Sequence, residues 1–554
     1  MMAITPDGAI EMFAARIVPR SGGVCGIMGG MSRWFNIAGP CIAANHYMLP
    51  ASERLPEARS LIRKKQYFVV HAPRQCGKTT AFRALMDEIN AKGDMAAMYC
   101  SVEAVQTWTD PDKAMIQLAA QIRLNLDLYP SIYGLGVKAE ILKATKESLS
   151  SEIIIDTLKW LSERVNKPFV VFFDEVDCLE RDVLIAFLRQ LRNGRISCTA
   201  PNSFPVSMAL IGLRNIRDYK MFIRPEGQST GEASPFNVIT KAMTISLFTE
   251  DEMRALYRQH TDETGQVFEE GALAKAWDYS RGQPWLVNAL ARWCVEEIHK
   301  EDFSKPVTAA DMDEAKEALI RERGTHLDSL MEKAYDPRIK PMIEQMLVGG
   351  EIDRDVQKED LRYAIELGLF VDNGGTIIPA NPIYRETIGR YLTRGTQDFI
   401  LSKTKKNVWV KDGRLDMPAL MASFQDFWRE NATPDSFVSQ NFHEAYPHFV
   451  LQAFLQRVVN GGGQIIREMA IGRGRLDLGV VFGNEKYAVE VKTSALYAKS
   501  PEKAHEQILK YMDGLGVSEG WLVVADADVT KPWDGKISTT DMTFGSKTVH
   551  LVRC

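Results

Sequence analysis

A short apolar segment that runs directly into a glycine-lysine-threonine loop constrains this chain more than any other feature. Residues 67–80 read YFVVHAPRQCGKTT and match the pattern G-x-x-x-x-G-K-[ST], with Ala72 in place of the first glycine. Such a loop wraps backbone N–H groups around phosphates at a helix N-terminus, where unpaired amides and the helix dipole favour an anion. We therefore predict a buried strand over 66–71, a phosphate-binding loop, and a helix that starts at Lys78 and ends near Gly93.

This loop predicts a nucleotide site. The ammonium group of Lys78 would contact the β- and γ-phosphates, and the hydroxyl of Thr79 would ligate Mg²⁺. The loop residues expected to hold ATP are Ala72, Pro73, Arg74, Gln75, Cys76, Gly77, Lys78, Thr79 and Thr80. The alternative is a chance Gly-Lys-Thr at a strand-to-helix turn.

Length and composition limit the class of protein. A chain of 554 residues corresponds to roughly three or four domains, and 45% apolar with 25% charged residues is ordinary for a soluble globular protein. The net charge of -5 gives no global signal for nucleic acid, so such binding would have to come from local basic surfaces. No apolar run reaches the ~18 residues of a membrane span. Eight cysteines without C-x-x-C spacing fit reduced thiols in the cytoplasm.

A second apolar segment ends in two acids. Residues 167–177 read KPFVVFFDEVD, and the run 169–173 is typical of a central parallel strand. Hydrolysis of ATP needs a magnesium-positioning acid and a water-activating acid at the tip of a strand that neighbours the loop. We interpret Asp174 as the acid that holds the Mg²⁺ shell and Glu175 as the general base. The alternative is that both acids cap the following helix.

A third strand, expected over 206–213, ends in Arg214-Asn215. These polar groups lie where a sensor of the γ-phosphate is expected, and a solvated strand end is the alternative.

Together these segments resemble the AAA-like P-loop ATPases, and more closely the bacterial and archaeal branch near the signal-transducing STAND ATPases. The resemblance rests on HAPRQCGKTT, VVFFDEVD and ALIGLRN, followed by SPFNV and LFTEDEM. It implies an ASCE-type parallel sheet and a helical lid whose Gly-x-Pro element contacts adenine, which Gly282 and Pro284 match. It further implies a nucleotide-contacting arginine at Arg214 and a lid sensor at Arg281. No clear arginine finger is found, so the sequence does not favour a ring-forming motor and leaves a homo-oligomer open.

The middle of the chain follows the order helix, helix, hairpin. Apolar positions recur through 339–347 and 361–369, and LFVDNGGTIIPA then carries an Asn-Gly turn between two β-rich runs. This order is typical of a winged helix, which either binds DNA or serves as a packing module in STAND-type ATPases. Since 361–369 offers only Arg362 as a positive group, we favour the packing role.

Toward the carboxyl end the pattern predicts short strands, IIREMA, RLDLGVVF and KYAVEVKT. A helix over 501–514 and the strand WLVVADA follow them. Alternation places Glu490 and Lys492 on one face of their strand, with Asp477 on the strand before. Two carboxylates and an amine on one surface can hold Mg²⁺ and activate water for attack on a phosphodiester. A surface strand with a Glu-Lys pair is the alternative.

This arrangement resembles the PD-(D/E)xK nucleases, which implies a restriction-endonuclease-like α/β domain. The resemblance assigns catalysis to Asp477, Glu490 and Lys492, with Asp477 and Glu490 holding Mg²⁺ or Mn²⁺. Gln507 and Tyr511 lie four apart on one helix face and match the QxxxY element of the RecB-like subgroup.

Further residues follow from the same resemblance. An acidic residue in the first helix often completes such sites, and Glu444, just upstream of that helix, is the candidate for this metal-binding acid. Arg473 and Arg475 would face the phosphodiester backbone. Leu476 stands where the motif's name places proline. Upstream, a basic run could contact nucleic acid, although a solvated face is the favoured interpretation; it comprises Lys403, Lys405, Lys406, Lys411 and Arg414.

The chain is thus expected to be a multidomain α/β protein. The expected parts are a disordered tail (1–30), a P-loop ATPase core (31–245), a helical lid (246–305), a winged helix (306–395), a linker (396–439) and a nuclease-like domain (440–554). One hypothesis is an ATPase whose nucleotide state gates a nuclease acting on DNA. The other is a nucleotide-driven signalling or assembly switch whose nuclease-like domain only binds DNA or a partner.

Overall fold

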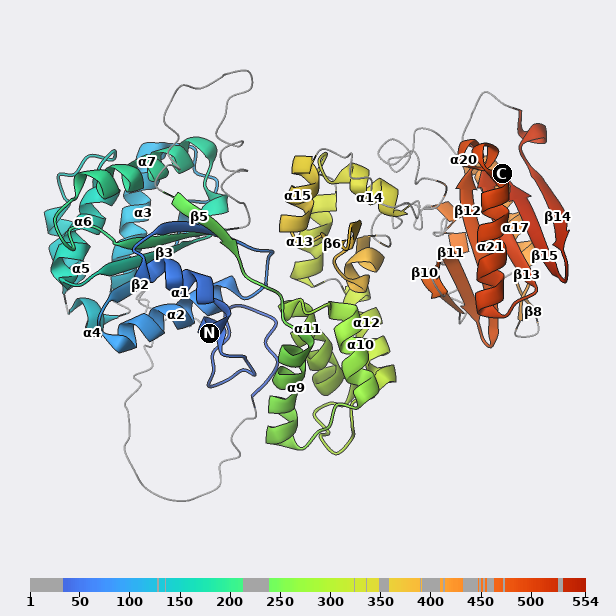
Figure 1. Cartoon of the computed structure of the whole chain (residues 1–554), viewed down its shortest axis with the longest axis horizontal. Helices are drawn as coiled ribbons and strands as arrows, with labels where there is room; N and C mark the ends of the chain where they lie inside the picture. The colour runs from blue at the N-terminus through green and yellow to red at the C-terminus, as the bar shows by residue number, and fades with distance from the viewer. Residues whose placement is uncertain are drawn as a thin grey trace, which may run out of the picture.

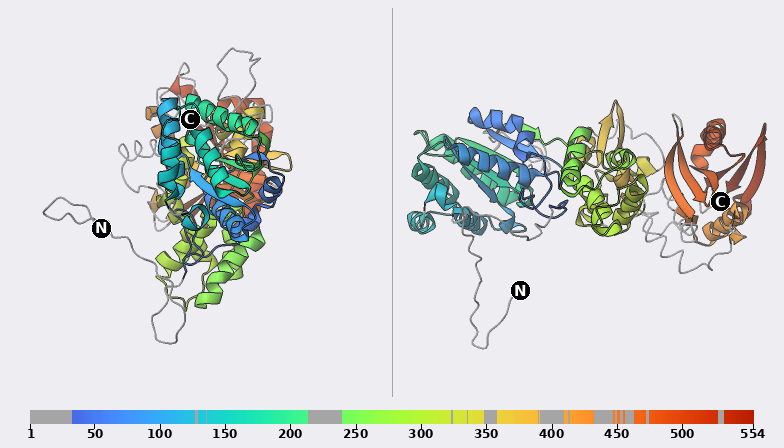
Figure 2. Two further views of the ribbon diagram at one scale, coloured as in Figure 1. Left: turned by 90° about the vertical axis from the view of Figure 1, so that its left-hand side faces the viewer. Right: turned by 90° about the horizontal axis from the view of Figure 1, so that it is seen from below.

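The computed structural model describes most of the chain. The described residues are 33–126, 129–134, 136–212, 239–322, 324–334, 336–347, 358–388, 390, 409–411, 414–431, 447, 450–451, 454–455, 463–471, 474–526 and 532–554, with the backbone alone for 463–478 within them. An N-terminal α/β unit, a helical middle and a C-terminal sheet follow one another along the long axis (Figure 1). The same order is visible from below, in the right-hand view of Figure 2.

The N-terminal unit is built on a parallel sheet with the strand order β2-β3-β4-β1-β5. Its strands are β1 (Tyr67–His71), β2 (Ala96–Ser101), β3 (Phe169–Asp174), β4 (Ser207–Gly212) and β5 (Ile239–Thr244). The predicted strands at 66–71 and 169–173 are confirmed within one residue. A parallel sheet with its glycine-lysine-threonine loop after β1 is a P-loop α/β fold.

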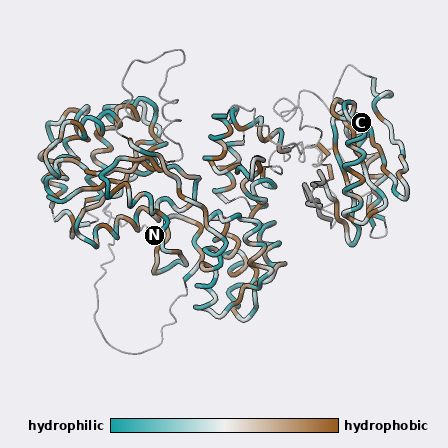
Figure 3. Tube along the Cα trace, viewed as in Figure 1, coloured by the Kyte–Doolittle hydropathy of each residue, from teal (hydrophilic) through white to brown (hydrophobic). Residues whose placement is uncertain are grey.

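Helices cover both faces of this sheet, so its central strands are buried throughout. The elements around them are η1 (Ala51–Arg54), α1 (Pro56–Arg63), α2 (Lys78–Lys92), η2 (Glu103–Val105), α3 (Pro111–Leu126), α4 (Pro130–Tyr133), α5 (Val137–Ala144), α6 (Ile153–Val165), η3 (Val176–Cys178) and α7 (Arg181–Ser197). α1 and α2 pack on one face and α3, α6 and α7 on the other. Hydrophobic residues accordingly follow the inner strands of this unit (Figure 3). Gly93, with φ +74°, ends α2 as predicted.

One detail of the sheet differs from the sequence expectation. The acids at the end of β3 were expected on a strand beside the loop, but β4 lies between β1 and β3. Strand order depends on how the crossover helices pack, which local sequence does not encode. The loop and the acids still share one edge of the sheet, because all five strands run in the same direction.

The helical middle begins with four helices, α9 (Glu250–Thr264), α10 (Glu270–Ser280), α11 (Pro284–Arg292) and α12 (Ala309–Glu322). α9 begins with a capping box, in which Thr249 Oγ1 accepts from Glu252 N at 3.2 Å and Glu252 Oε2 accepts from Thr249 N at 2.7 Å. α9, α10 and α11 lie within 246–305, the range expected as the lid, and α12 lies within the range expected as the winged helix. All four helices lie beside the N-terminal unit (Figure 1).

The expected helix-helix-hairpin follows. It consists of α14 (Lys340–Leu347), α15 (Lys358–Glu366), β6 (Phe370–Asn373) and β7 (Thr376–Pro379), and a further helix, α13 (Thr325–Ala334), precedes it. The turn lies one residue later than expected, at Gly374 and Gly375, because Asn373 pairs with Thr376 and closes the ladder. Both glycines have positive φ, which two-residue hairpin turns require.

The C-terminal unit is a six-stranded mixed sheet with the order β10-β11-β12-β13-β15-β14. Its elements are β10 (Gly463–Ile471), β11 (Gly474–Phe482), β12 (Glu485–Thr493), α20 (Ser494–Lys499), α21 (Pro501–Leu515), β13 (Glu519–Ala525), η6 (Trp533–Gly535), β14 (Ser538–Phe544) and β15 (Lys547–Arg553). β10 to β12 are antiparallel, while β12, β13 and β15 are parallel. The four predicted strands form as β10 to β13, and β14 and β15 extend the sheet beyond them.

The segment expected as a linker contains structure of its own. A small pair of strands, β8 (Val410–Lys411) and β9 (Arg414–Leu415), precedes α17 (Met417–Asn431). In α17 the side chain of Gln425 donates to the carbonyls of Ser538 and Arg553 at 3.1 and 2.7 Å, and Trp428 is fully buried. α17 therefore packs on the C-terminal sheet, because its apolar side chains recur at helical spacing and need a partner surface.

Two further observations concern all of the described residues together. Among the described helices, none combines the length and apolarity needed to cross a membrane. The seven cysteines within the described residues are all free thiols.

Candidate functional site

The loop between β1 and α2 folds around its own lysine. Gln75 and Gly77 adopt left-handed backbone angles, with φ of 55° and 88°, which turn the chain sharply into α2. Lys78 Nζ donates to the carbonyl oxygens of Ala72 and Pro73 at 2.9 and 3.0 Å. The ammonium group thus lies within the curve of the loop, next to the positive end of a 15-residue helix.

The two acids at the end of β3 lie next to this loop. Thr79 Oγ1 donates to Asp174 Oδ2 at 2.8 Å, and the hydroxyl of Tyr99 donates to the same oxygen. The other oxygen of Asp174 accepts from the backbone N–H of Glu175 at 2.9 Å. Asp174 is only 1% exposed. The fold therefore joins the hydroxyl and the carboxylate that the sequence assigned to a metal site, although 95 positions separate them.

Glu175 has an unusual conformation and environment. Its φ of 61° is rare for a residue with a side chain, and the side chain lines a cavity together with Glu103. Burial and the adjacent charge of Asp174 raise the pKa of Glu175, and the charge of Lys78 only partly opposes them. A carboxylate with a raised pKa is better suited to accept a proton from water.

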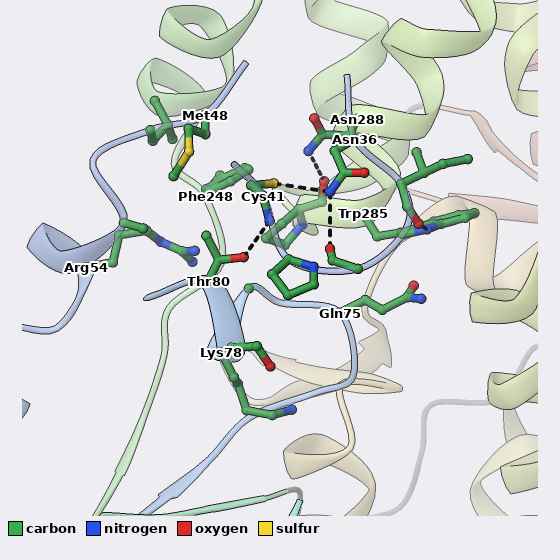
Figure 4. A pocket seen from close by; sticks show the side chains of 18 of the residues that line it. Asn36, Cys41, Met48, Arg54, Gln75, Lys78, Thr80, Phe248, Trp285 and Asn288 are labelled. Carbon is green, nitrogen blue, oxygen red and sulfur yellow. Dashed lines mark hydrogen bonds between the residues drawn. The ribbon is translucent and has the colours of Figure 1, made fainter. Parts of the chain in front are cut away.

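The cavity in front of the loop has a volume of about 450 Å³, which is within the range of small-molecule sites. Loop residues form one end and lid residues the other, with the chain between residues 36 and 54 along the side (Figure 4). The predicted residues that line it are Arg74, Gln75, Gly77, Lys78, Thr79, Thr80, Glu175 and Pro284. The lining residues that sequence analysis missed include Asn36, Cys41, Met48, Arg54, Phe248, Trp285 and Asn288.

Arg54 is the most informative of the missed residues. Its guanidinium donates to Cys76 O at 3.2 Å and to Ser246 O, and it lies 4.7 Å from the centre of the Phe248 ring. No carboxylate among the described residues forms an ion pair with it, and burial lowers the pKa of Arg54. Its hydrogen bonds go to carbonyl oxygens and Glu252 acts on it only as a charge outside ion-pair distance, so the guanidinium can still attract an anion in the cavity. No sequence motif marked this arginine.

The segment 33–50 connects the loop helix to the lid. Cys41 N donates to Thr80 Oγ1 at 3.1 Å in the first turn of α2, as Figure 4 shows. Trp285 Nε1, at the start of α11, donates to Ile37 O at 2.9 Å. One wall of the cavity is therefore made by a segment that lies well before the loop in sequence.

The two named residues of the Gly-x-Pro element have different positions relative to the cavity. Pro284 lines the cavity, whereas Gly282 is absent from its described lining. Gly282 instead lies against Phe248, whose N–H donates to Gly282 O at 2.8 Å, and Phe248 does line the cavity. Arg281, the expected lid sensor, pairs with Asp278 and is likewise absent from the described lining.

The middle unit contacts the loop from the side. Arg74 Nη1 donates to Ser329 Oγ of α13 at 2.9 Å, and Pro73 packs against Gly368 after α15. These contacts bring α13 and the residue after α15 against the phosphate-binding loop.

At the C-terminal sheet, Lys492 Nζ donates to Glu490 Oε1 at 2.6 Å, and Glu490 is fully buried. Gln507 Nε2 donates to the Tyr511 hydroxyl at 3.2 Å on α21, so these two share a helix face as expected. Asp477 is the residue before Leu478, whose backbone pairs with Val489. The backbone of β11 therefore brings position 477 beside position 490.

Several of the remaining expected site residues lie outside the part of the chain that the structure describes. Arg475 is described by its β11 backbone alone, and Arg214, Glu444 and Arg473 lie outside the described residues. In the basic run, Lys411 and Arg414 form ion pairs with Asp416 and Glu485. Within the part of the chain that the structure describes, no three His, Cys, Asp or Glu side chains gather as a metal site.

Comparison with protein-family models finds no match, and neither does comparison with curated proteins. Among solved structures, the chain is similar to a Walker-type ATPase of Pyrococcus abyssi, with 14% identity, a TM-score of 0.47, and coverage of 64% of this chain and 99% of that one. It is also similar to Cdc6p from Pyrobaculum aerophilum, with 11% identity, a TM-score of 0.34, and coverage of 64% of this chain and 97% of that one. A third similar structure is the RuvB Holliday junction branch migration motor of Thermotoga maritima, with 12% identity, a TM-score of 0.30, and coverage of 59% of this chain and 91% of that one. The chain's own loop and strand order, rather than these similarities, define its P-loop fold.

Proposed function

We propose that the N-terminal half binds ATP with Mg²⁺ and hydrolyses it. The observation that carries this proposal is the contact of Thr79 with Asp174 beside a cavity lined by Lys78 and Glu175. A cation for phosphates, two oxygen ligands for a metal and an acid for water are the parts that phosphoryl transfer needs.

The residues present fit the metal and the nucleotide. The Thr79 hydroxyl and the Asp174 carboxylate offer the hard oxygen ligands that Mg²⁺ prefers. When bound there, Mg²⁺ would neutralise developing phosphate charge. The loop N–H groups and Lys78 would bind the phosphates, and Glu175 would orient the attacking water and accept its proton. Arg54 would add positive charge on the wall beside Cys76.

Two variants test this proposal. We expect Lys78→Ala to abolish ATP binding, because it removes the charge within the loop. We expect Glu175→Gln to bind ATP like the parent chain but to lose hydrolysis, since an amide cannot accept the proton. Equilibrium binding of ATP and release of phosphate measure the two effects. Parent-like ATP binding by Lys78→Ala would refute the nucleotide site, and parent-like hydrolysis by Glu175→Gln would refute the assigned base.

We further propose that the C-terminal domain is a Mg²⁺- or Mn²⁺-dependent nuclease acting on DNA, gated by the nucleotide state. The support is the buried Glu490 in contact with Lys492, beside the backbone of Asp477 on β11. Asp477 and Glu490 would hold the metal, which would lower the pKa of a water, and Lys492 would stabilise charge on the phosphate. The second candidate function, a nucleotide-driven switch with a non-cleaving domain, is favoured by the ion pair of Lys492 with Glu490, which gives the Glu490 carboxylate a cationic partner without a metal.

Incubation with single-stranded DNA, duplex DNA and RNA distinguishes these candidates, with and without ATP and with Mg²⁺ or Mn²⁺. We expect Asp477→Ala and Lys492→Ala to lose cleavage while ATP binding persists. Lys486→Ala is the matched control, because Lys486 is exposed on the same strand. Cleavage that survives both site variants would exclude this nuclease site. Absence of cleavage by the parent chain under every condition would favour the switch.

A further inference from the structure

Tyr99 contributes a second hydroxyl to the carboxylate of Asp174. It lies near the end of β2, and its hydroxyl donates to Asp174 Oδ2, the same oxygen that Thr79 contacts at 2.8 Å. The hydroxyls of Tyr99 and Thr79 are 3.4 Å apart, so all three groups meet at one point. Tyr99 is only 6% exposed. No sequence motif indicated this residue.

The parallel sheet sets this contact. Ser101 is the residue of β2 opposite Asp174, and Tyr99 is two residues earlier on the same face of the strand. The guanidinium of Arg83, on α2, lies 5.0 Å from the centre of the Tyr99 ring. The long tyrosine side chain therefore reaches along the sheet to the acid from a fixed position.

The hydroxyl of Tyr99 acts as a proton donor in this contact. An ionised carboxylate only accepts hydrogen bonds, so the proton of this contact comes from the phenol. Asp174 thus receives hydroxyl donors at Oδ2 and a backbone donor, Glu175 N, at Oδ1. Rotation of the carboxylate would break these hydrogen bonds together, which holds it in one orientation.

We propose that Tyr99 is a positioning residue that orients Asp174 toward the Mg²⁺ of a bound nucleotide. This inference rests on the proposed ATP site and adds to it a hydroxyl from a neighbouring strand. Groups that hydrogen-bond a metal-binding side chain commonly change metal affinity by about 10- to 100-fold when removed. The Tyr99 hydroxyl has this relation to Asp174, since it contacts the carboxylate while Tyr99 itself is absent from the described cavity lining.

The test is Tyr99→Phe in the full chain, which removes one oxygen atom and retains the ring. Binding of a fluorescent ADP analogue is titrated with Mg²⁺, and Mn²⁺ binding to the ADP complex is followed by electron paramagnetic resonance. We expect the variant to need about 10-fold more of either metal, with unchanged ADP affinity in EDTA. Tyr133→Phe is the matched control, because the Tyr133 hydroxyl is also buried and donates to a β2 carbonyl, Ala97 O, at 3.2 Å.

The outcomes separate the two proposals. An unchanged metal requirement in Tyr99→Phe, with metal-dependent binding intact in the parent, would overturn the positioning role and leave the ATP site standing. An equal loss of ADP affinity with metal and in EDTA would show a merely structural role and overturn it as well. A parent chain without metal-dependent nucleotide binding would overturn the ATP site and this inference with it. A thermal melt verifies that both variants are folded.

Discussion

Replacing Gly282 with alanine tests whether the lid is held by a close backbone approach. Gly282 has a φ of +77°, and an added Cβ would lie 2.0 Å from the carbonyl oxygen of Phe248. No side chain tolerates that distance, and the obstacle is backbone rather than the end of a flexible side chain. The hydrogen bond from Phe248 N to Gly282 O, at 2.8 Å, would have to lengthen or break.

The free-energy cost of Gly282→Ala has two contributions. A left-handed conformation costs alanine roughly 1 kcal/mol relative to glycine. Displacement of the Phe248 backbone and its hydrogen bond adds about 2 kcal/mol, within the range of overpacked sites and lost hydrogen bonds. Gly265→Ala is the matched control, because Gly265 has a φ of +81° at the end of α9 and nothing lies within 4 Å of its added Cβ. Gly265→Ala should therefore cost only the first contribution.

Hydrogen exchange of the backbone amides of α9 to α11 measures this difference locally. A local measurement is needed because a chain of several domains does not unfold in two states. The extra ~2 kcal/mol predicts about 30-fold faster exchange in Gly282→Ala than in Gly265→Ala, since 1.4 kcal/mol is a factor of ten. ATP affinity should also fall in Gly282→Ala, because Phe248 lines the cavity. Equal exchange in the two variants would refute the close-approach argument.

Two other predictions concern charged groups. Arg54→Ala should weaken ATP binding about tenfold, which corresponds to the loss of one charge-assisted hydrogen bond, and Arg54→Lys should recover part of the affinity. Unchanged affinity in a binding titration of Arg54→Ala would show that this arginine does not attract the phosphates. Glu386→Gln should destabilise the contact between α12 and the segment after β7 by about 1 kcal/mol at pH 7, because Lys316 and Arg390 would lose one half-buried partner and keep their ion pairs with Glu317. Burial raises the pKa of Glu386, but the charges of Arg390 and Lys316 outweigh it and hold that pKa below 4.5. The stabilisation is thus present above pH 4.5 and is lost as the pH falls below it. The melting temperatures of variant and parent should therefore become equal in acid. A difference in melting temperature that stays the same at every pH would contradict this prediction.

Local patterns predicted the parts of the fold that depend on neighbouring residues. The apolar run before the loop, the positive-φ Gly93 after α2 and the glycine turn of the β6-β7 hairpin were all visible as spacing and residue type. α17 was missed and assigned to a linker, because its flanking polar residues concealed a helix that is stabilised by the C-terminal sheet. Helix propensity alone is weak when the packing surface comes from elsewhere in the chain.

The sequence by itself determined the chemistry available at the N-terminal site, since Lys78, Thr79, Asp174 and Glu175 lie in short motifs with a known physical purpose. Only the tertiary structure decided what surrounds them. The insertion of β4, the cavity wall from residues 33–54 and the contact of Tyr99 with Asp174 join segments that are tens to hundreds of residues apart. Such contacts depend on which surfaces bury each other, and a one-dimensional pattern records which face of a strand or helix is apolar but not what covers it.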